Sequence, residues 1–279
     1  MSTQLGLEGM PRRLFTCTPS RLTTWLDCPR RYRLTYLDRP PPPRGAPWAH
    51  NTVGAAVHLA LARWWSEPFA RRTPAVARGL LDRGWRTDGF ADDAQAERWR
   101  VRAGDMVERY VATLAPDDEP VGVERTVAMR TGALAVSGRV DRLDQRGDEL
   151  VVVDYKTGRS VLTTDDARGS LALALYALAA ARTFRRRCRT VELHHLPTGT
   201  VSSFAHDDSS LARHLFRAEA VGAEAVAAAE ALLAGGDPQE LFPVRTGSRC
   251  SWCDVASACP EGRTVARPLR PWDGLAAGG

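Results

Sequence analysis

Two neighbouring segments, GRVDRLD at residues 138–144 and VVVDYK at residues 151–156, constrain the fold of this chain more than any other feature. VVVDYK is a run of apolar β-branched residues, which is typical of a buried strand, and GRVDRLD has the pattern of a second strand. The polar stretch RGDE between them contains Gly147 and is typical of a hairpin turn. The sequence therefore predicts two antiparallel strands lying side by side in a sheet.

The predicted hairpin brings three charged side chains together. Side chains two residues apart on a strand share a face, so Asp154 and Lys156 point the same way and Tyr155 points to the other face. Asp141, on the partner strand, can reach the same point. Two carboxylates beside a lysine suit a hard divalent cation and the positioning of a water molecule. Each acid alone is as typical of a turn or an ion pair, but the lysine on the same face favours a cation site.

The segments around the hairpin predict a mixed α/β fold, with one central sheet flanked by helices and helical additions at the N-terminus. Further strands are expected from VGVERTVAM at residues 121–129 and from VELHHLPTGTVSSFAH at residues 191–206. Helical periodicity falls in residues 51–66, twice within 74–115, in 170–185 and in 208–235.

The N-terminal segment TPSRLTTWLDCPRRYRLTYLDR also has helical spacing, which Pro29 interrupts. Ser20 is a candidate N-cap. Arg30, Arg31 and Arg33 form a basic cluster, which is either a solvated helix face or a surface for a nucleic-acid backbone.

Composition restricts the kind of partner and the compartment. The net charge of +5 and the pI near 9.1 come largely from arginine, which fits a phosphate-rich partner. No run of 18 apolar residues is present, so no transmembrane helix is expected. The N-terminus has no apolar segment typical of a signal peptide, and we expect a cytoplasmic protein whose six cysteines are reduced.

Three of the cysteines, Cys250, Cys253 and Cys259, have the spacing C-x2-C-x5-C, which is typical of metal ligands. A tetrahedral site needs a fourth ligand, and Cys17, Cys28 and Cys188 are the candidates. Both zinc and an iron–sulfur cluster suit four cysteines, so the spacing alone leaves these two cofactors open.

Taken in order, these motifs resemble the RecB-type exonuclease branch of the PD-(D/E)XK nucleases, in the form that carries a 4Fe–4S cluster. The resemblance covers roughly residues 17–262, and AddB-type subunits and CRISPR-associated adaptation nucleases have a similar layout. The matching motifs are SRLTTWLDCPRRYRLTYL, GAAVH at residues 54–58, GRVDRLD, VVDYKTG and the C-terminal cysteines.

The resemblance implies a single nuclease domain over residues 14–262, with a restriction-endonuclease-like core. Its helical part is expected at about 51–115, its catalytic sheet at about 120–235, and its cysteine cluster at Cys28 and 250–259. Residues 1–13 and 263–279 are then predicted to be disordered tails.

The resemblance also implies roles for individual residues. Asp141, Asp154 and Lys156 match the catalytic acids and lysine, and His58 matches a histidine that binds the metal, Mg²⁺ or Mn²⁺. The carbonyl of Tyr155 is a further candidate ligand. Four residues match the ligands of the 4Fe–4S cluster, with zinc as the alternative: Cys28, Cys250, Cys253 and Cys259.

Three further positions have open interpretations. Glu124 is either a third acid at the site or a solvated strand residue. The family usually has glutamine where this chain has Ala172, four residues before Tyr176. Tyr176 itself is either a core residue or a nucleic-acid contact. Charge and location make Arg139 and Arg142, with the basic cluster above, further candidates for binding a DNA backbone.

The predicted function is therefore metal-dependent exonuclease activity on DNA, preferably single-stranded or with free ends, in repair or recombination, with a helicase as a candidate partner. The alternative is a non-catalytic nucleic-acid-binding subunit of a helicase–nuclease complex that keeps the fold and an iron–sulfur or zinc site. The intact Asp141, Asp154 and Lys156 favour the enzyme.

Overall fold

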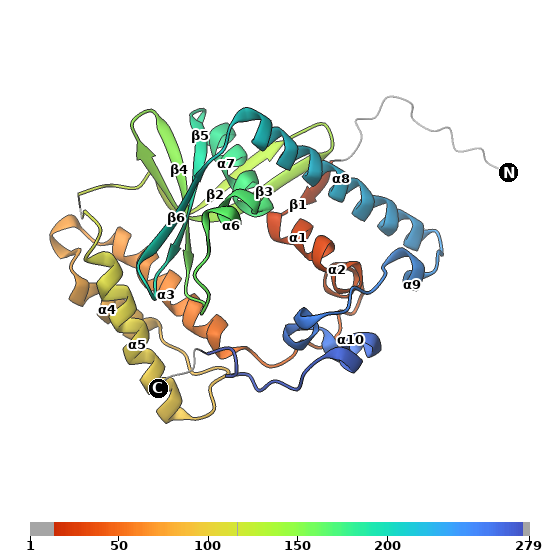
Figure 1. Ribbon diagram of the computed structural model, residues 1–279, viewed down its shortest axis with the longest axis horizontal. Helices are drawn as coiled ribbons and strands as arrows, with labels where there is room; N and C mark the ends of the chain where they lie inside the picture. The colour runs from red at the N-terminus through yellow and green to blue at the C-terminus, as the bar shows by residue number, and fades with distance from the viewer. Residues whose placement is uncertain (1–13, 116, 276–279) are drawn as a thin grey trace.

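The computed structural model describes residues 14–115 and 117–275, and these form a mixed sheet with helices on both faces (Figure 1). The strand order is β1-β3-β4-β5-β6, and β2 pairs with the free edge of β3. The strands are β1 (Phe15–Cys17), β2 (Gly122–Arg130), β3 (Leu134–Arg146), β4 (Glu149–Lys156), β5 (Arg187–His195) and β6 (Thr200–Ala205). The predicted hairpin is β3 and β4, and the predicted mixed α/β class is confirmed.

The longer helices fall where the periodicity predicts them, and α6, α9 and α10 are short additions. In chain order, the helices are α1 (Pro19–Asp27), α2 (Pro29–Tyr36), α3 (Ala49–Ser66), α4 (Pro74–Gly84), α5 (Asp93–Val111), α6 (Thr164–Gly169), α7 (Leu171–Phe184), α8 (Asp208–Leu233), α9 (Pro238–Leu241) and α10 (Pro260–Val265). Short 3-10 turns occur at Phe69–Arg71, Ser248–Trp252 and Ala256–Ala258. Among the described helices, none is both long and apolar enough to cross a membrane.

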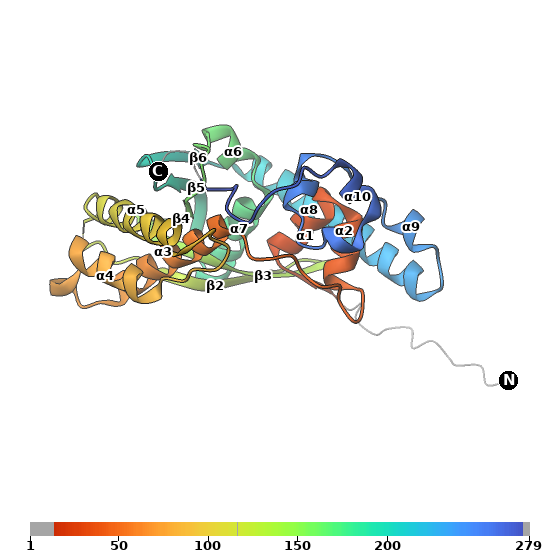
Figure 2. The ribbon, with the colours of Figure 1, turned by 90° about the horizontal axis from the view of Figure 1, so that it is seen from below.

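Each face of the sheet packs against its own set of helices. Leu150 and Val152 of β4 belong to the core that α1, α7 and α8 form, whereas Val151 and Val153 pack with α3, α4 and α5. Figures 1 and 2 show α3, α4 and α5 grouped at one end of the molecule, and α1, α2, α8 and α10 at the other. Strand β4 is thus covered on both sides, as its unbroken apolar run predicts.

Strand β3 pairs with two different strands along one of its edges, with β1 at residues 134–136 and with β4 at residues 142–146. Along its other edge it pairs with β2, from Gly122↔Leu143 to Arg130↔Ala135. Within the described residues, 137–141 therefore have no strand partner on the first edge, and the sheet is split there.

A tyrosine of α7 packs into this split. A Cβ atom on Gly138 would lie 2.5 Å from Cε1 of Tyr176 and 3.2 Å from Cδ of Pro19. Only glycine lets α7 and the start of α1 approach β3 so closely, and this fixes the helices against the split.

Three local predictions need correction. Thr18, not Ser20, caps α1, because its side chain accepts from the backbone N–H of Arg21 and Pro19 takes the first helical position. Residues 158–169, where no helix was predicted, contain α6. Residues 263–275 are not a disordered tail: Leu275 is buried and Trp272 packs with the core of α3 and α5. The predicted tails at 1–13 and 276–279 lie outside the described residues.

We predict that Gly138→Ala lowers the free energy of unfolding by about 1–3 kcal/mol, because the added methyl group must displace the ring of Tyr176 or the backbone of β3. Chemical denaturation measures this change. Gly132→Ala is the matched control, since a Cβ atom there meets nothing within 4 Å. An equal stability for the two variants would contradict the close packing of Tyr176 on β3.

Candidate metal centre and cysteine site

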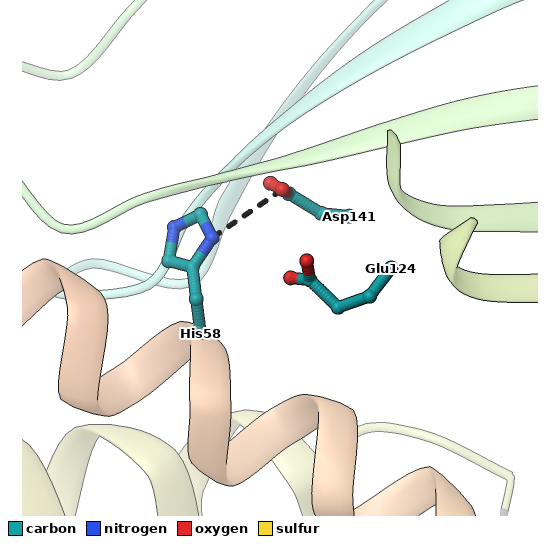
Figure 3. Close-up of side chains that lie close together, drawn as sticks. All are labelled: His58, Glu124 and Asp141. Carbon is teal, nitrogen blue, oxygen red and sulfur yellow. Dashed lines mark ion pairs between the residues drawn. The ribbon is translucent and has the colours of Figure 1, made fainter. Parts of the chain in front are cut away.

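Three potential metal ligands come together at the split, each from a different element. They are His58 of α3, Glu124 of β2 and Asp141 of β3, and one ligand atom from each lies within 4.8 Å of the other two. Nδ1 of His58 is 3.3 Å from Oδ1 of Asp141. Figure 3 shows the imidazole and both carboxylates pointing toward a common space. The sequence predicts His58 and Asp141 as ligands, and the structure adds Glu124 beside them.

One local irregularity in the pairing of β2 and β3 turns an acid of each strand toward α3. Glu124 and Asp141 lie opposite each other, between the pairs Val123↔Arg142 and Arg125↔Val140. Glu124 has a φ of 48°, a left-handed conformation that costs a residue with a side chain roughly 1–2 kcal/mol. Strain of this kind persists where the surrounding structure holds it, often at functional sites.

This irregularity also reverses the alternation of side chains along both strands. Val127 and Val140 pack in the core of α7, whereas Val123 packs with α3 and α5, and Arg142 lies over Trp65 of α3. A regular strand would place Val123 and Val127 on one face. The reversal falls at Glu124 and Asp141, and it directs both acids to His58.

Asp154 and Lys156 share one face of β4, as predicted. Oδ2 of Asp154 is 2.5 Å from Nζ of Lys156, whose side chain is 40% exposed. The backbone of Tyr155 between them faces the cluster: its N–H donates to Oδ2 of Asp141 at 2.8 Å, and its carbonyl oxygen is 3.2 Å from Nε2 of His58. The carbonyl predicted as a ligand thus lies beside the predicted histidine.

The charged groups at this site shift one another's pKa values. Burial raises the pKa of Asp154, and so does the nearby charge of Asp141, although Lys156 acts in the opposite direction. Burial also raises the pKa of Glu124. Burial would lower the pKa of His58, but its hydrogen bond to Asp141 and the charges of the three acids outweigh burial and raise it. Carboxylates held together in this way gain most from a divalent cation between them, so the residues fit such an ion.

The other face of Tyr155 is held by a buried arginine. Arg142 is 3% exposed and donates to the hydroxyls of Tyr110 at 3.1 Å and Tyr155 at 3.4 Å, while it pairs with both carboxylate oxygens of Asp144. Its guanidinium group therefore holds β4 from the face opposite the acids. This burial argues against the predicted DNA contact, and we no longer assign one to Arg142.

Two other candidates for nucleic-acid contact lie near the acids. Nε of Arg139 is 2.6 Å from Oε2 of Glu124, and its side chain is largely exposed. Tyr176 is half-buried, and burial together with the charges of Asp154 and Asp141 raises its pKa. Both stay predicted contacts, since both border the split.

The four predicted cysteines line one cavity of about 260 Å³ between α2 and the segment 244–262. Backbone N–H groups point at two of the sulfur atoms: those of Arg31 and Arg245 lie 3.5 Å from Sγ of Cys28, and that of Gly262 lies 3.3 Å from Sγ of Cys259. Cys17 and Cys188 instead lie in the main core, where burial raises the pKa of their thiols to about 11 and about 12. The structure thus selects Cys28 as the partner of the C-terminal three.

The basic cluster of α2 belongs to this cysteine site. Arg30 is 4% exposed and donates to the carbonyl of Phe242 at 3.1 Å, to Gln239 and to Glu261. Arg31 pairs with Asp254 at 3.2 Å, and Arg33 donates to the carbonyl of Pro238. These side chains hold the C-terminal segment against α2. The burial of Arg30 argues against its predicted DNA contact, and Arg31 and Arg33 are only partly available for one.

The sequence indicated Glu124 only weakly. It lies in a predicted strand close to the acids, but the left-handed backbone that turns it inward has no sequence signal at a glutamate.

The adjacent pair His194-His195 is not a metal site: His194 contacts Tyr110 and Glu192 at 2.8 and 2.9 Å, whereas His195 contacts Thr198 and the carbonyl of Gly158.

A family comparison covers the region that contains these residues. The profile of the PD-(D/E)XK nuclease superfamily matches residues 16–260, which is most of the chain. The chain belongs to the PD-(D/E)XK nuclease superfamily, whose members use divalent metal ions.

Similarity to individual proteins is distant. No curated protein sequence matches the chain. A solved structure described as "Crystal structure of SSO0001" is 13% identical, with 90% of this chain and 88% of that chain covered and a TM-score of 0.38. A structure from Eubacterium rectale described as a "Putative exonuclease" is 11% identical, with 71% and 86% covered and a TM-score of 0.36. At these identities and TM-scores, neither structure indicates a function for this chain.

We predict that Mn²⁺ raises the melting temperature of the protein through the cluster at the split. At an ion concentration about 100 times the dissociation constant, binding adds about 2.7 kcal/mol to the free energy of unfolding. His58→Ala and Glu124→Gln should each reduce this gain, as thermal melts with and without Mn²⁺ would measure. The matched control is Asp165→Asn, an exposed acid on α6 that should keep the full gain. Equal gains in all four proteins would contradict the site.

Proposed function

We propose that this chain is a divalent-metal-dependent nuclease of the RecB type, which hydrolyses DNA from an end. The observation that carries the proposal is the convergence of His58, Glu124 and Asp141 with the Asp154–Lys156 pair at the split between β3 and β4. Three carboxylates, an imidazole and a single lysine meet there, and this combination supplies both an ion site and a positive group beside it.

The donor set indicates the ion. Carboxylate and carbonyl oxygens suit Mg²⁺ and Mn²⁺, and the nitrogen of His58 makes Mn²⁺ the better fit of the two. When bound, such an ion lowers the pKa of a coordinated water and polarises a phosphoryl oxygen. Asp141 and Asp154 would hold it with His58, while Glu124 and the carbonyl of Tyr155 are within reach.

Lys156 is placed to act on the reacting phosphate. Asp154 fixes the position of its ammonium group, and the side chain is still partly open to solvent. From there Nζ can orient the attacking water or stabilise negative charge on the phosphoryl oxygens in the transition state. Asp154 thus both contributes to the ion site and aligns the lysine.

A DNA substrate is supported by charge and by the surroundings of the acids. The chain has a net charge of +5, and Arg139 extends from the site into solvent. In this proposal the preferred substrate is a single strand or a strand with a free end. A role in DNA repair or recombination, in the cytoplasm and with a helicase partner, is part of the proposal.

We propose further that Cys28, Cys250, Cys253 and Cys259 hold a 4Fe–4S cluster. No three of the four sulfur atoms, all on described residues, lie within 4.8 Å of one another, whereas one tetrahedral zinc ion with Zn–S bonds of about 2.3 Å would bring its sulfurs closer than that. The wider spacing and the cavity of about 260 Å³ favour a polynuclear cluster. Its role would be structural, since its ligands join α2 to the C-terminal segment.

For the nuclease, we expect Asp154→Asn and Lys156→Gln each to lower the rate of DNA cleavage with Mn²⁺ by at least about 100-fold, because each removes a group that acts on the transition state. Cleavage of end-labelled single strands measures the rate, with Asp165→Asn as the control for an acid outside the site. Equal rates of cleavage by the wild type and both site variants would contradict the catalytic assignment. Binding of DNA without any cleavage would favour the non-catalytic subunit instead.

For the cofactor, the anaerobically purified protein should be brown, with broad visible absorption and four iron atoms per chain as expected for one such cluster. Cys253→Ala should bleach the colour and lower the melting temperature, whereas Cys188→Ala should keep the colour because Cys188 lies in the core. A colourless protein with one zinc ion per chain would overturn the cluster.

A further inference from the structure

A second cavity lies beyond the end of β4, next to the loop that follows Lys156. It encloses about 570 Å³, and its walls come from α3, α5, this loop, the turn between β5 and β6, and the C-terminal segment. Its size is that of a site for one small ligand, or for one part of a larger ligand. The residues that decide its chemistry are His50, Trp99, Arg102, Arg109, Arg159 and Leu275.

Three arginines give this cavity a positive charge. Within the described residues, Arg102, Arg109 and Arg159 form no ion pair within 4.0 Å, and the lining carboxylate of Asp105 is paired with Arg78. Arg102 stacks on Trp99 with its guanidinium carbon 5.3 Å from the ring centroid. Guanidinium groups match phosphate oxygens in charge and geometry, so the cavity is suited to a phosphate group.

The helix α5 presents this charge as one stripe. Trp99, Arg102, Met106 and Arg109 are spaced three or four residues apart, so they lie along one face of the helix. The third arginine, Arg159, comes from the loop after β4, where it donates to the carbonyl of Asp273 at 2.5 Å and to that of Leu275. These carbonyl contacts hold its side chain at the cavity, next to the carboxylate of Asp273, which pairs with Arg270.

The cavity and the metal centre lie along the same face of α3. His50, Gly54 and His58 are separated by four residues each, and a Cβ atom on Gly54 would lie 3.2 Å from Oγ1 of Thr157. His50 lines the cavity and His58 belongs to the metal centre. Two helical turns, about 12 Å, therefore separate the two sites along the helix. A strand held at both sites would need to extend only a few nucleotides.

We propose that this cavity binds the terminal phosphate of the strand that is being degraded, so that a phosphodiester bond close to that end lies at the metal centre. The inference rests on the proposed nuclease function. Three guanidinium groups match a terminal phosphate, which carries a charge of about −1.5 to −2, better than the single charge of an internal phosphodiester.

The test is a binding measurement that needs no cleavage. Short single strands of one sequence, with a 5′-phosphate, a 3′-phosphate or hydroxyls at both ends, are titrated into the full-length protein in buffer freed of divalent ions. We expect one of the two phosphorylated strands to bind about tenfold more tightly than the unphosphorylated strand, because charge-assisted hydrogen bonds form only with the terminal phosphate. Which one binds gives the polarity.

Variants of the cavity arginines test whether the terminal phosphate binds in this cavity. Arg102→Gln and Arg159→Gln should each reduce the preference several-fold, and the double variant should abolish it. Arg98→Gln, an exposed arginine on α5 outside the cavity, should keep it. Equal binding of the three strands, or a preference that survives in the double variant, would overturn the proposal. Inorganic phosphate that competes as strongly as the phosphorylated strand would also overturn it, in favour of a free-phosphate site.

This result separates the two proposals. A phosphate preference in a protein that cleaves nothing with Mn²⁺ would contradict the nuclease and keep the phosphate site. Cleavage by a protein that binds all three strands equally would contradict only the phosphate site.

Discussion

The separation of β4 from β3 after Val153 is the constraint on which the rest of the structure depends. The last pair of the two strands is Arg142↔Val153, after which β4 continues beside β5 as far as Lys156↔His195. The N–H of Tyr155 then has no strand partner in β3 and donates to the carboxylate of Asp141. One hydrogen bond therefore satisfies the freed backbone and fixes an acid of the site in place. The other acids, the histidine and the lysine are arranged around this point.

The cysteine site is joined to the metal centre through α3. Trp252, between two of the cysteines, packs on Trp48 at a centroid distance of 4.8 Å, and Trp48 immediately precedes α3. Backbone hydrogen bonds from Gly45 to Asp254 and from Ala49 to Pro271 hold the same junction. Because α3 carries His58, loss of the cysteine site would loosen the helix that supplies this candidate metal ligand. The proposed cofactor would therefore support the acidic site, although its ligands are far from the acids in sequence.

Much of the site follows from local patterns in the sequence, and the rest depends on distant contacts. The run VVVDYK and the turn at Gly147 are sufficient to predict the hairpin and the shared face of Asp154 and Lys156, because strand periodicity is local. The burial of Arg30 and Arg142 was not predictable, since most of their partners are supplied by elements distant in sequence, such as the carbonyl of Phe242 and the hydroxyl of Tyr110. The inward turn of Glu124 depends on a left-handed backbone that glutamate rarely adopts. Residues 263–275 carry too few apolar residues to indicate packing, yet Trp272 and Leu275 are sufficient to anchor them.

The most direct test of this account is anomalous diffraction from crystals of the protein grown with Mn²⁺. The account predicts an anomalous peak at the split between β3 and β4, within bonding distance, about 2.0–2.3 Å, of oxygen atoms of Asp141 and Asp154 and of a nitrogen of His58. A manganese ion bound elsewhere, with no peak between these three side chains, would contradict it.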